Sequence, residues 1–326
     1  MIGERCRARW IASGGATGMC PTTSSLQARA ALLVALASLL VLTLPGCGGR
    51  LTPIEPAPIL TPAPAPTGTP APKDTVAPAP TPTSDCRALP GRVDSITYPS
   101  LLLEKPIPVR VYVPPCHDET ALAFPTLYLL HGYPFDETEW GALGLDLLVA
   151  GAVMSGEWPP FLVVMPRVPE PLFRSSDGGP YSYEAELTDG LVTFIDLTFH
   201  TDPRPDRRAI AGISRGGVWS LEIGLNNPDV FGGVAAISPA LQLNSARKQY
   251  DPIYIVRRGE PLPPRIYLLA GDGDWAREAT QDLALLLEGL GVAHQYVVYP
   301  GGHDDASWAP ALKPLIAYLI AEWPRP

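Results

Sequence analysis

The stretch "RRAIAGISRGGVWS", residues 207–220, decides the fold. A short apolar run, 209–213, leads directly into Ser214, which has a glycine two positions before it and another two positions after it. The residues that follow suit a helix. A serine at so tight a strand-to-helix turn adopts strained dihedral angles, and flanking glycines remove side chains that would clash there. The pattern G-x-S-x-G therefore predicts a nucleophile elbow rather than an ordinary glycine-rich loop.

Strand-like and helix-like segments alternate along the chain after residue 90. Continuous apolar runs, typical of strands buried on both faces, occur at 108–113, 126–131, 161–166, 209–213, 233–238, 265–271 and 295–300. The segment 92–98 alternates more and predicts an antiparallel edge strand. Helical patterns follow Ser214 and occupy 183–199, 277–291 and 305–323. This order predicts an α/β fold, a mostly parallel central sheet with helices on both faces, and it contains no internal repeat.

The N-terminal residues 1–46 have the pattern of an export leader. The apolar run 30–44 has 15 residues, short of the roughly 20 that span a membrane, and it suits a signal peptide behind a basic segment. It ends in "LPGC", which resembles the lipobox of bacterial lipoproteins, so Cys47 is the expected lipidation site. Translation starts at Met1 or, more compactly, at Met19. Cleavage with release, or an uncleaved anchor, are the alternatives, and each of them exports the domain that follows.

A proline-rich segment, 47–84, joins the leader to the rest of the chain. Between Gly48 and Ser84, 11 of 37 residues are proline, mixed with alanine and threonine. Such a composition cannot bury enough apolar surface to offset the entropy of ordering. We expect a disordered, extended linker here, and a single folded domain over 85–326.

Export also changes the interpretation of cysteine and charge. Cys86 and Cys116 are the two cysteines of the mature domain, and an oxidising compartment favours a disulfide between them over two free buried thiols.

Loss of the leader removes four arginines and one glutamate, which leaves 20 basic and 32 acidic residues, a net charge of −12. Because no basic stripe is present, nucleic acid is not an expected partner.

A serine hydroxyl needs a base, and α/β hydrolases place the acid and then the histidine after the serine in the chain. Of the five histidines, only His294 and His303 follow Ser214. His303 lies in a loop, "PGGHDDASW", just past the last predicted strand, where a base is well presented. His294 stands at the start of that strand and is the alternative.

The acid is expected after the strand 265–271, where "GDGDW" offers Asp272 and Asp274. Asp304 and Asp305 adjoin His303 but more simply cap the last helix. An oxyanion hole requires two backbone donors. One is the N–H of Arg215, and the other is the Tyr133 N–H in the loop "LLHGYPFDETEW", residues 129–140.

Five segments together resemble the esterase D-like family of α/β hydrolases, in order and in spacing: "VRVYVPP", "TLYLLHG", "RRAIAGISRGG", "GDGDW" and "GGHDDASW". The resemblance covers residues 88–323. This family includes feruloyl and acetyl xylan esterases, siderophore trilactone esterases and mycobacterial mycolyltransferases. The resemblance implies an α/β-hydrolase fold without metal or cofactor, and it selects Asp274 over Asp272, because the acid comes three residues after a strand-ending glycine.

The expected function is that of a serine carboxylic-ester hydrolase, lipid-anchored at the outer face of the bacterial cytoplasmic membrane or at the cell surface. Its triad of Ser214, His303 and Asp274 would act through an acyl-enzyme on a small-molecule or glycan-linked ester. An acyltransferase of the mycolyltransferase type and a non-catalytic hydrolase-like binding domain are the alternatives. The sequence predicts neither the natural ester nor the oligomeric state. It also leaves open whether Trp140, Trp275 and Trp308 line the cleft or lie in the core.

Overall fold

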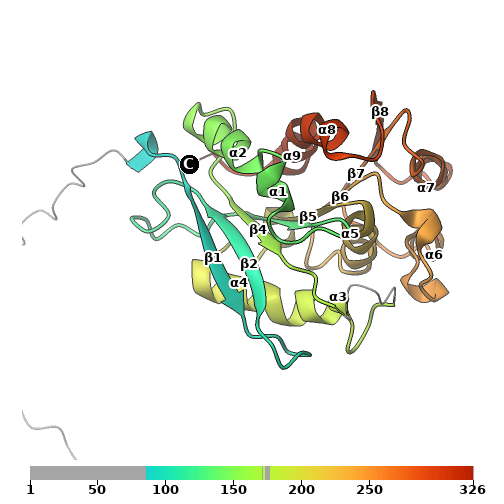
Figure 1. The fold of residues 1–326 in the computed structure, drawn as a ribbon, viewed down its shortest axis with the longest axis horizontal. Coiled ribbons are helices and arrows are strands. Elements are labelled where there is room, and N and C mark those ends of the chain that lie inside the picture. The colour runs from blue at the N-terminus through green and yellow to red at the C-terminus, as the bar shows by residue number, and fades with distance from the viewer. Residues whose placement is uncertain (1–85, 171, 173–176, 326) are drawn as a thin grey trace, which may run out of the picture. The chain divides into compact units, whose positions relative to one another are not determined.

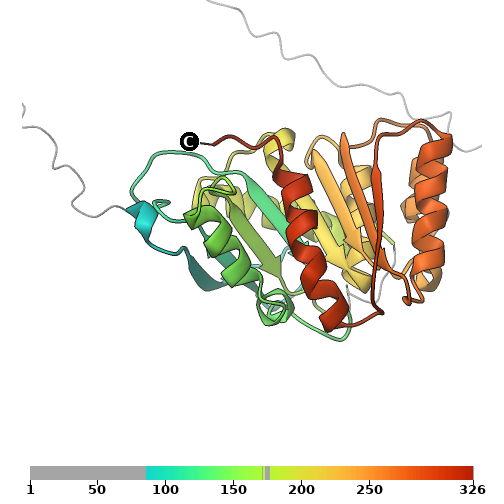
Figure 2. The ribbon, with the colours of Figure 1, turned by 90° about the horizontal axis from the view of Figure 1, so that it is seen from above.

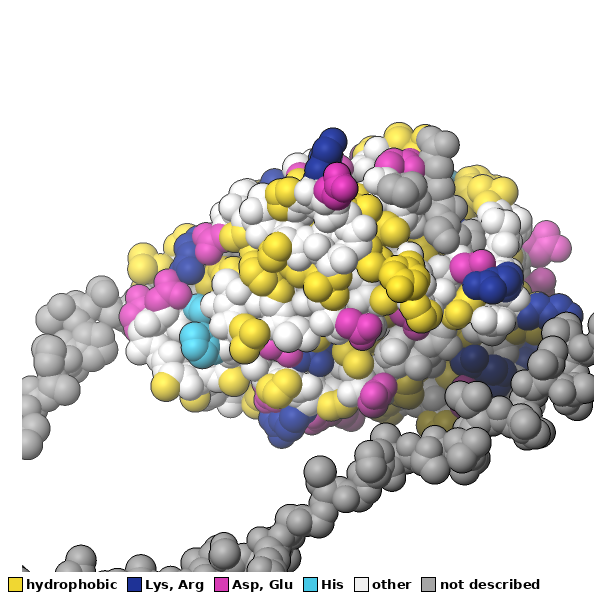
Figure 3. Space-filling model, turned by 90° about the horizontal axis from the view of Figure 1, so that it is seen from below, with side chains coloured by type: hydrophobic (Ala, Val, Ile, Leu, Met, Phe, Trp, Pro, Cys, Tyr) yellow, Lys and Arg dark blue, Asp and Glu magenta, His cyan; other side chains and the backbone are white. Residues whose placement is uncertain are grey.

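The computed structural model describes residues 86–170, 172 and 177–325. The predicted leader, the lipidation site Cys47 and the proline-rich linker lie outside these residues. Within them, none of the helices is long and apolar enough to cross a membrane. Figure 3 shows one face of the molecule, where exposed hydrophobic side chains lie among acidic and basic ones.

Eight strands of the described chain form one sheet in the order β1-β2-β4-β3-β5-β6-β7-β8 (Figure 1). The first two strands pair antiparallel with each other, β2 pairs antiparallel with β4, and all the remaining pairs are parallel. The strands are β1 (Arg92–Tyr98), β2 (Ile107–Val113), β3 (Thr126–Leu130), β4 (Leu162–Pro166), β5 (Arg208–Ile213), β6 (Gly233–Ile237), β7 (Arg265–Gly271) and β8 (Gln295–Tyr299). The predicted strands and the mostly parallel sheet are therefore confirmed.

Burial along the strands follows from their place in the sheet. Every residue of β3, β4, β5, β6 and β7 is buried, whereas the residues of the edge strands β1 and β8 are exposed or half-buried except for Tyr98 at the end of β1. Continuous apolar runs fit interior strands because both of their faces meet helices.

Helices cover both faces of the sheet, as predicted (Figures 1 and 2). Apolar side chains of α1 (Glu139–Ala142), α2 (Leu145–Met154) and α9 (Leu312–Ile320) pack on one face. Those of α3 (Tyr183–Ala185), α4 (Val192–Phe199), α5 (Ser214–Asn226), α6 (Pro252–Arg257) and α7 (Arg277–Gly289) pack on the other. The helix that bears the serine thus lies entirely in a packed layer, which holds its N-terminus firmly.

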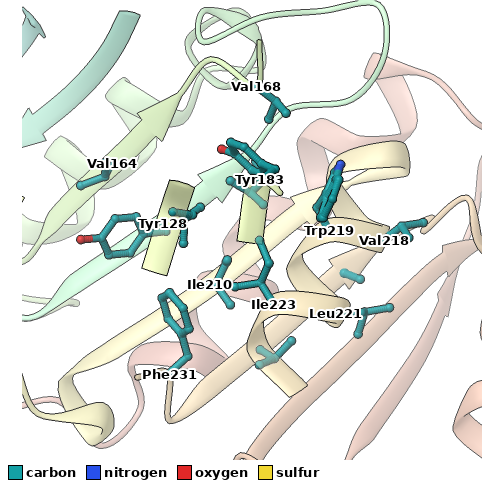
Figure 4. Packing of buried hydrophobic residues seen from close by; sticks show 14 of the residues in the cluster. Tyr128, Val164, Val168, Tyr183, Ile210, Val218, Trp219, Leu221, Ile223 and Phe231 are labelled. Carbon is teal, nitrogen blue, oxygen red and sulfur yellow. The ribbon is translucent and has the colours of Figure 1, made fainter. Parts of the chain in front are cut away.

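Aromatic side chains fix α5 against its neighbours (Figure 4). Trp219 meets Tyr183 edge-on, with ring centroids 5.5 Å apart and planes at 69°. In the same core layer, Tyr128 of β3 meets Phe231 in the same manner, at 5.8 Å and 82°. Edge-to-face pairs of this kind stabilise by more than their buried area alone.

Two predicted helices are interrupted. The segment 183–199 contains a π-helical turn, Glu186–Leu191, between α3 and α4. This turn brings the buried Glu186 carboxylate to the loop after β1, where it accepts hydrogen bonds from the Ser100 hydroxyl (2.8 Å) and the Leu101 N–H (2.9 Å). The C-terminal segment 305–323 divides into α8 (Asp305–Trp308), a 3₁₀ turn and α9. The helices α1, α2 and α6 were not predicted.

The structure contains the expected disulfide between Cys86 and Cys116. The bond spans 30 residues of sequence. It joins the first described residues to the chain just after β2, and the loop that it closes holds both β1 and β2.

Candidate active site

Ser214 is the first residue of α5 and directly follows β5. Its φ is +53°, in the left-handed region that few side chains adopt, and the residue is 8% exposed. A Cβ on Gly212 would clash with the Gly216 carbonyl, and a Cβ on Gly216 would clash with the carbonyls of Leu130 and His131. The two glycines of the motif are thus required by close backbone packing, which also brings the end of β3 against the start of α5.

His303 lies in the loop after β8 and connects Ser214 with Asp274. Its Nε2 is 2.9 Å from Ser214 Oγ, and its Nδ1 is 2.9 Å from Asp274 Oδ1. Asp274, in the loop after β7, accepts a further hydrogen bond from the Ala276 N–H at 2.7 Å. The Asp274 side chain is fully buried, and that of His303 is 15% exposed. The three side chains therefore form one hydrogen-bonded series from a buried carboxylate to the serine hydroxyl.

The electrostatics of Asp274 favour its charged form. Burial alone raises the pKa of this carboxyl, but hydrogen bonds with His303, Ser238 and the Ala276 N–H outweigh burial, so that the pKa falls below its ordinary value. A carboxylate that stays ionised can hold His303 with its proton on Nδ1. That tautomer leaves Nε2 as the acceptor facing the Ser214 hydroxyl.

The alternative residues make other contacts. Asp272 is exposed, and its Oδ1 accepts from the Gly301 N–H at 3.0 Å. His294 Nδ1 is 2.9 Å from the Val292 carbonyl, to which it donates. Asp304 caps α8 by accepting from the Ser307 N–H at 3.0 Å, as expected. Of the two pairs of candidates, the structure brings Asp274 and His303 to Ser214.

Two indole rings surround the His303 imidazole. The Trp275 ring centroid lies 4.3 Å from that of His303 at 33°, and the Trp308 centroid lies 5.0 Å away at 82°. Trp275 is 46% exposed, whereas Trp308 is 3% exposed. Trp140 belongs to α1 and is buried in the core on that face of the sheet. The sequence did not decide whether these three tryptophans line the cleft or lie in the core. In the structure, Trp140 lies in the core, Trp308 packs against His303 from the buried side, and Trp275 covers His303 at the surface.

Ser238 connects this region to the triad, and sequence reasoning missed it. It follows β6, is fully buried and has a φ of +49°. The Trp308 Nε1–H donates to Ser238 Oγ at 3.3 Å, and Tyr299 Oη lies 3.2 Å from the same atom. Asp274 Oδ2 has no hydrogen-bond partner among the described residues, and the Ser238 hydroxyl contributes to the lowered pKa of Asp274. A serine just past an apolar strand was its only sequence signal.

The loop after β3 is fixed by two side chains. The Gly132 N–H donates to Glu139 Oε2 at 2.7 Å. His131 Nε2 accepts from the Val168 N–H at 2.8 Å, so its Nδ1 carries the proton and donates to the Gly132 carbonyl at 2.9 Å. Burial lowers the pKa of His131, which keeps the ring neutral. Because His131 also packs on Gly216, this loop and the Tyr133 that it carries lie beside the start of α5.

Two hollows flank the loop and share the exposed rings of Tyr133 and Phe135. One, of about 460 Å³, is also lined by His303, Trp308, Asp304 and Asp305. The other, of about 370 Å³, is also lined by His131, Asp136, Arg167 and Val168. Aromatic side chains and carboxylates thus lie together beside His303. Over residues 86–170, 172 and 177–325, no three His, Cys, Asp or Glu side chains are arranged to hold a metal ion.

The strand-turn-helix serine, the order of serine, acid and histidine, and the eight-stranded sheet define an α/β hydrolase. Residues 100–319 match the family model described as "Putative esterase". The chain belongs to this esterase family, and the matched residues form its esterase domain.

Curated relatives agree with this assignment. The chain is 27% identical over 228 residues to an endo-1,4-beta-xylanase/feruloyl esterase of Xylanibacter ruminicola, an alignment that covers 64% of the chain but 30% of that relative. It is 25% identical over 217 residues to an acetyl esterase of Caldicellulosiruptor saccharolyticus, covering 56% of the chain and 78% of that enzyme. The chain thus spans less than a third of the length of the first of these relatives.

Solved structures share the fold. A ferulic acid esterase superposes with a TM-score of 0.62 at 21% identity, covering 70% of this chain and 97% of that one. The Staphylococcus aureus fluorophosphonate-binding serine hydrolase FphF gives a TM-score of 0.61 at 23% identity, covering 71% and 99%. At these identities the similarity concerns the α/β-hydrolase fold alone.

Proposed function

We propose that this protein hydrolyses carboxylic esters with Ser214 as nucleophile, His303 as general base and Asp274 as the residue that orients the base. The observation that carries the proposal is the hydrogen-bonded series from Asp274 through His303 to Ser214, at 2.9 Å for each His303 contact. Membership of the esterase family and the esterase names of its relatives support it.

In the proposed mechanism, His303 Nε2 takes the Ser214 proton while Oγ attacks the ester carbonyl carbon. The carbonyl oxygen becomes an oxyanion, which the backbone N–H groups of Arg215 and Tyr133 bind. His303 then gives the proton to the leaving alcohol, which leaves an acyl group on Ser214. Water, deprotonated by His303, attacks this acyl-enzyme, and the acid leaves as Ser214 recovers its proton. Asp274 holds the imidazole and stabilises its charged form throughout.

The expected substrate is a small-molecule or glycan-linked ester. The hollow beside His303 offers the exposed rings of Tyr133 and Phe135 together with the carboxylates of Asp304 and Asp305, which suits a group with both apolar faces and hydroxyls. An acyltransferase would differ only in the nucleophile that resolves the acyl-enzyme. Product ratios measured with and without an added alcohol or sugar acceptor separate these two outcomes.

We also propose that the domain acts outside the cytoplasm, tethered through a lipid on Cys47. The leader pattern carries this part of the proposal, and the disulfide of Cys86 with Cys116 supports it, because such bonds persist in oxidising compartments. Expression of the full chain in a bacterium with a labelled fatty acid should label the wild type, whereas Cys47→Ala should stay unlabelled. Equal labelling of the two would refute lipidation at Cys47.

The catalytic proposal is tested by Ser214→Ala. We expect kcat for p-nitrophenyl acetate to fall by about 10⁴-fold or more, because the remaining machinery lacks a nucleophile. The melting temperature should stay close to that of the wild type. A fluorophosphonate probe should label the wild type at Ser214 and leave the variant unlabelled. A folded wild type that neither reacts with the probe nor cleaves esters would instead indicate the non-catalytic binding domain.

A further inference from the structure

Glu139 is a buried carboxyl that the triad does not use. It begins α1, directly after the loop that carries Tyr133, and is 3% exposed. Its Oε2 accepts the Gly132 N–H at 2.7 Å. Its Oε1 is buried and has no hydrogen-bond partner among the described residues. A carboxyl with one oxygen satisfied and one oxygen unsatisfied is costly to bury, so its place in this loop requires an explanation.

The carboxyl also lies close to the nucleophile. A Cβ built on Gly132 would stand 3.4 Å from Glu139 Oε1 and 3.5 Å from Ser214 Cβ. Gly132 therefore separates the carboxyl from Ser214 by the width of a single backbone. Because the Gly132 N–H points to Glu139, the orientation of the next peptide, which carries the Tyr133 N–H, depends on this hydrogen bond.

The charge of Glu139 is finely balanced. Burial raises the pKa of the carboxyl to about 7, the hydrogen bond from Gly132 opposes this rise, and the negative charges of Asp305 and Asp136 add to it. Asp305 faces it from α8 and Asp136 from the loop itself. The charged and titratable groups of this region also include Glu137, its partner Arg167, the neutral His131 and the triad residue His303. Either protonation state of Glu139 accepts the Gly132 N–H, but only the neutral state avoids a negative charge beside a developing oxyanion.

We propose that Glu139 is a positioning residue for the oxyanion hole: its carboxyl holds the Gly132 N–H and thereby aims the Tyr133 N–H at the oxyanion. The inference rests on the proposed function, since it concerns the same reaction. Glu139 touches neither the substrate nor the reacting atoms, so its effect is indirect and should appear in kcat rather than in KM.

The test compares two variants of nearly equal size. Glu139→Gln keeps a carbonyl that can accept the Gly132 N–H, whereas Glu139→Met does not. We expect kcat for p-nitrophenyl acetate to fall about 10- to 100-fold in Glu139→Met, below the loss of about 10²- to 10³-fold seen when an oxyanion donor is removed outright. KM should stay within about threefold, and Glu139→Gln should restore kcat to near the wild-type value. The exposed Glu157→Gln, whose carboxylate pairs with Lys313 at 2.8 Å, is the control and should behave as wild type.

Two further measurements separate positioning from simple structural support. Phenylboronic acid forms a tetrahedral adduct on an activated serine, so its affinity should fall in Glu139→Met in proportion to kcat and recover in Glu139→Gln. Between pH 7 and 9, Glu139→Gln should equal or exceed the wild type in kcat, because it lacks the charge that the wild type acquires there.

The kinetics of the two Glu139 variants either support or overturn the inference. Wild-type kcat in Glu139→Met, or a loss in Glu139→Gln as large as in Glu139→Met, would overturn the inference. If Glu139→Met fails to fold, a kcat for Glu139→Gln below the wild-type value at pH 9 overturns it, and a value at or above the wild type supports it. A wild type that reacts with a fluorophosphonate at Ser214 shows that the proposed function stands even where the Glu139 inference fails. If the wild type does not react with the fluorophosphonate, both the proposed function and the Glu139 inference are refuted.

Discussion

Two buried carboxyl groups, those of Asp274 and Glu222, differ in the form that their surroundings favour: the charged form for Asp274 and the neutral form for Glu222. Asp274 contacts His303, the Ala276 N–H and the Ser238 hydroxyl, and its pKa is lowered despite burial. Glu222 lies two turns into α5 and is 1% exposed, but neither of its oxygens has a hydrogen-bond partner among the described residues. Burial raises the pKa of Glu222 to about 9, and the charge of Glu184 adds to this. Hydrogen-bond donors, not depth, decide which buried carboxyl is charged.

The comparison explains why one group can serve catalysis and the other cannot. A charged carboxylate at Asp274 can stabilise an imidazolium in the reaction, because its own desolvation is already offset by donors. Glu222 at neutral pH is a neutral carboxylic acid within a packed helix. The positive charge of Arg215 lowers the pKa of Glu222 but does not overcome burial. Burial of a carboxyl is therefore insufficient evidence of a catalytic role.

The largest effect should come from removing the charge of Asp274. We expect Asp274→Asn to lower kcat by about 10⁴-fold, because an amide favours the wrong imidazole tautomer. Asp272→Asn is the matched control two residues away and should stay within about twofold of the wild type, since Asp272 only binds the Gly301 N–H. Steady-state kinetics with p-nitrophenyl acetate measures both. A large loss in Asp272→Asn alone would reverse the assignment of the acid.

The second-largest effect should be the pH dependence that Glu222 gives to the free energy of unfolding. The folded-state pKa of Glu222, about 9, lies above the ordinary glutamate value of 4.5, so the folded state binds the proton more tightly than the unfolded state. Its contribution to the free energy of unfolding is therefore fully present below about pH 4.5 and is lost as the pH rises toward 9, by about 1.4 kcal/mol per pH unit.

Glu222→Gln removes this dependence. Urea unfolding at pH 5, 7 and 9 should show a difference in unfolding free energy, variant minus wild type, that grows with pH. The control Glu157→Gln should leave that difference flat. A parallel pH dependence of Glu222→Gln and wild type would mean that Glu222 is charged in the fold, and the contrast with Asp274 would then be lost.

The smallest effect should come from Ser238→Ala, which removes a single donor near Asp274. We expect kcat to fall about 3- to 10-fold with KM nearly unchanged, since one hydrogen bond contributes about 1 kcal/mol. Tyr299→Phe removes a partner of the Ser238 hydroxyl but no contact with Asp274, and it should have a weaker effect. Unchanged kcat in Ser238→Ala would show that His303 and Ala276 alone suffice to keep Asp274 charged.

The sequence predicted those parts of the fold and site that depend on local pattern. Interior strands are continuous apolar runs because both of their faces are buried, so the sequence pattern predicted every one of them. The elbow glycines, the loop after the last strand and the order of serine, acid and histidine located the three side chains that the structure brings together. The roles of these residues remain predictions, as does the export leader, which lies outside the described residues.

Features that depend on distant contacts were missed. Ser238 matters only because Trp308 and Tyr299, some 60 to 70 positions later, reach its hydroxyl. Glu139 appears in sequence as one of several acidic residues in a polar loop, and only the turn back to Gly132 gives it a function. The π-helical turn reflects contact between Glu186 and the loop after β1, 84 to 86 residues earlier. None of these contacts leaves a periodic trace in the sequence.

The disulfide also determines how the domain would bear a mechanical load. It joins Cys86 to Cys116 and encloses β1 and β2 in one covalent loop. A pull along the chain that precedes Cys86 passes through the sulfur atoms to Cys116 and on toward β3, an interior strand paired on both sides. The antiparallel edge is therefore shielded from peeling, and the force is resisted by shear between parallel strands. In the reduced protein, by contrast, the same pull would reach β1 first and would separate β1 from β2 one residue pair after another.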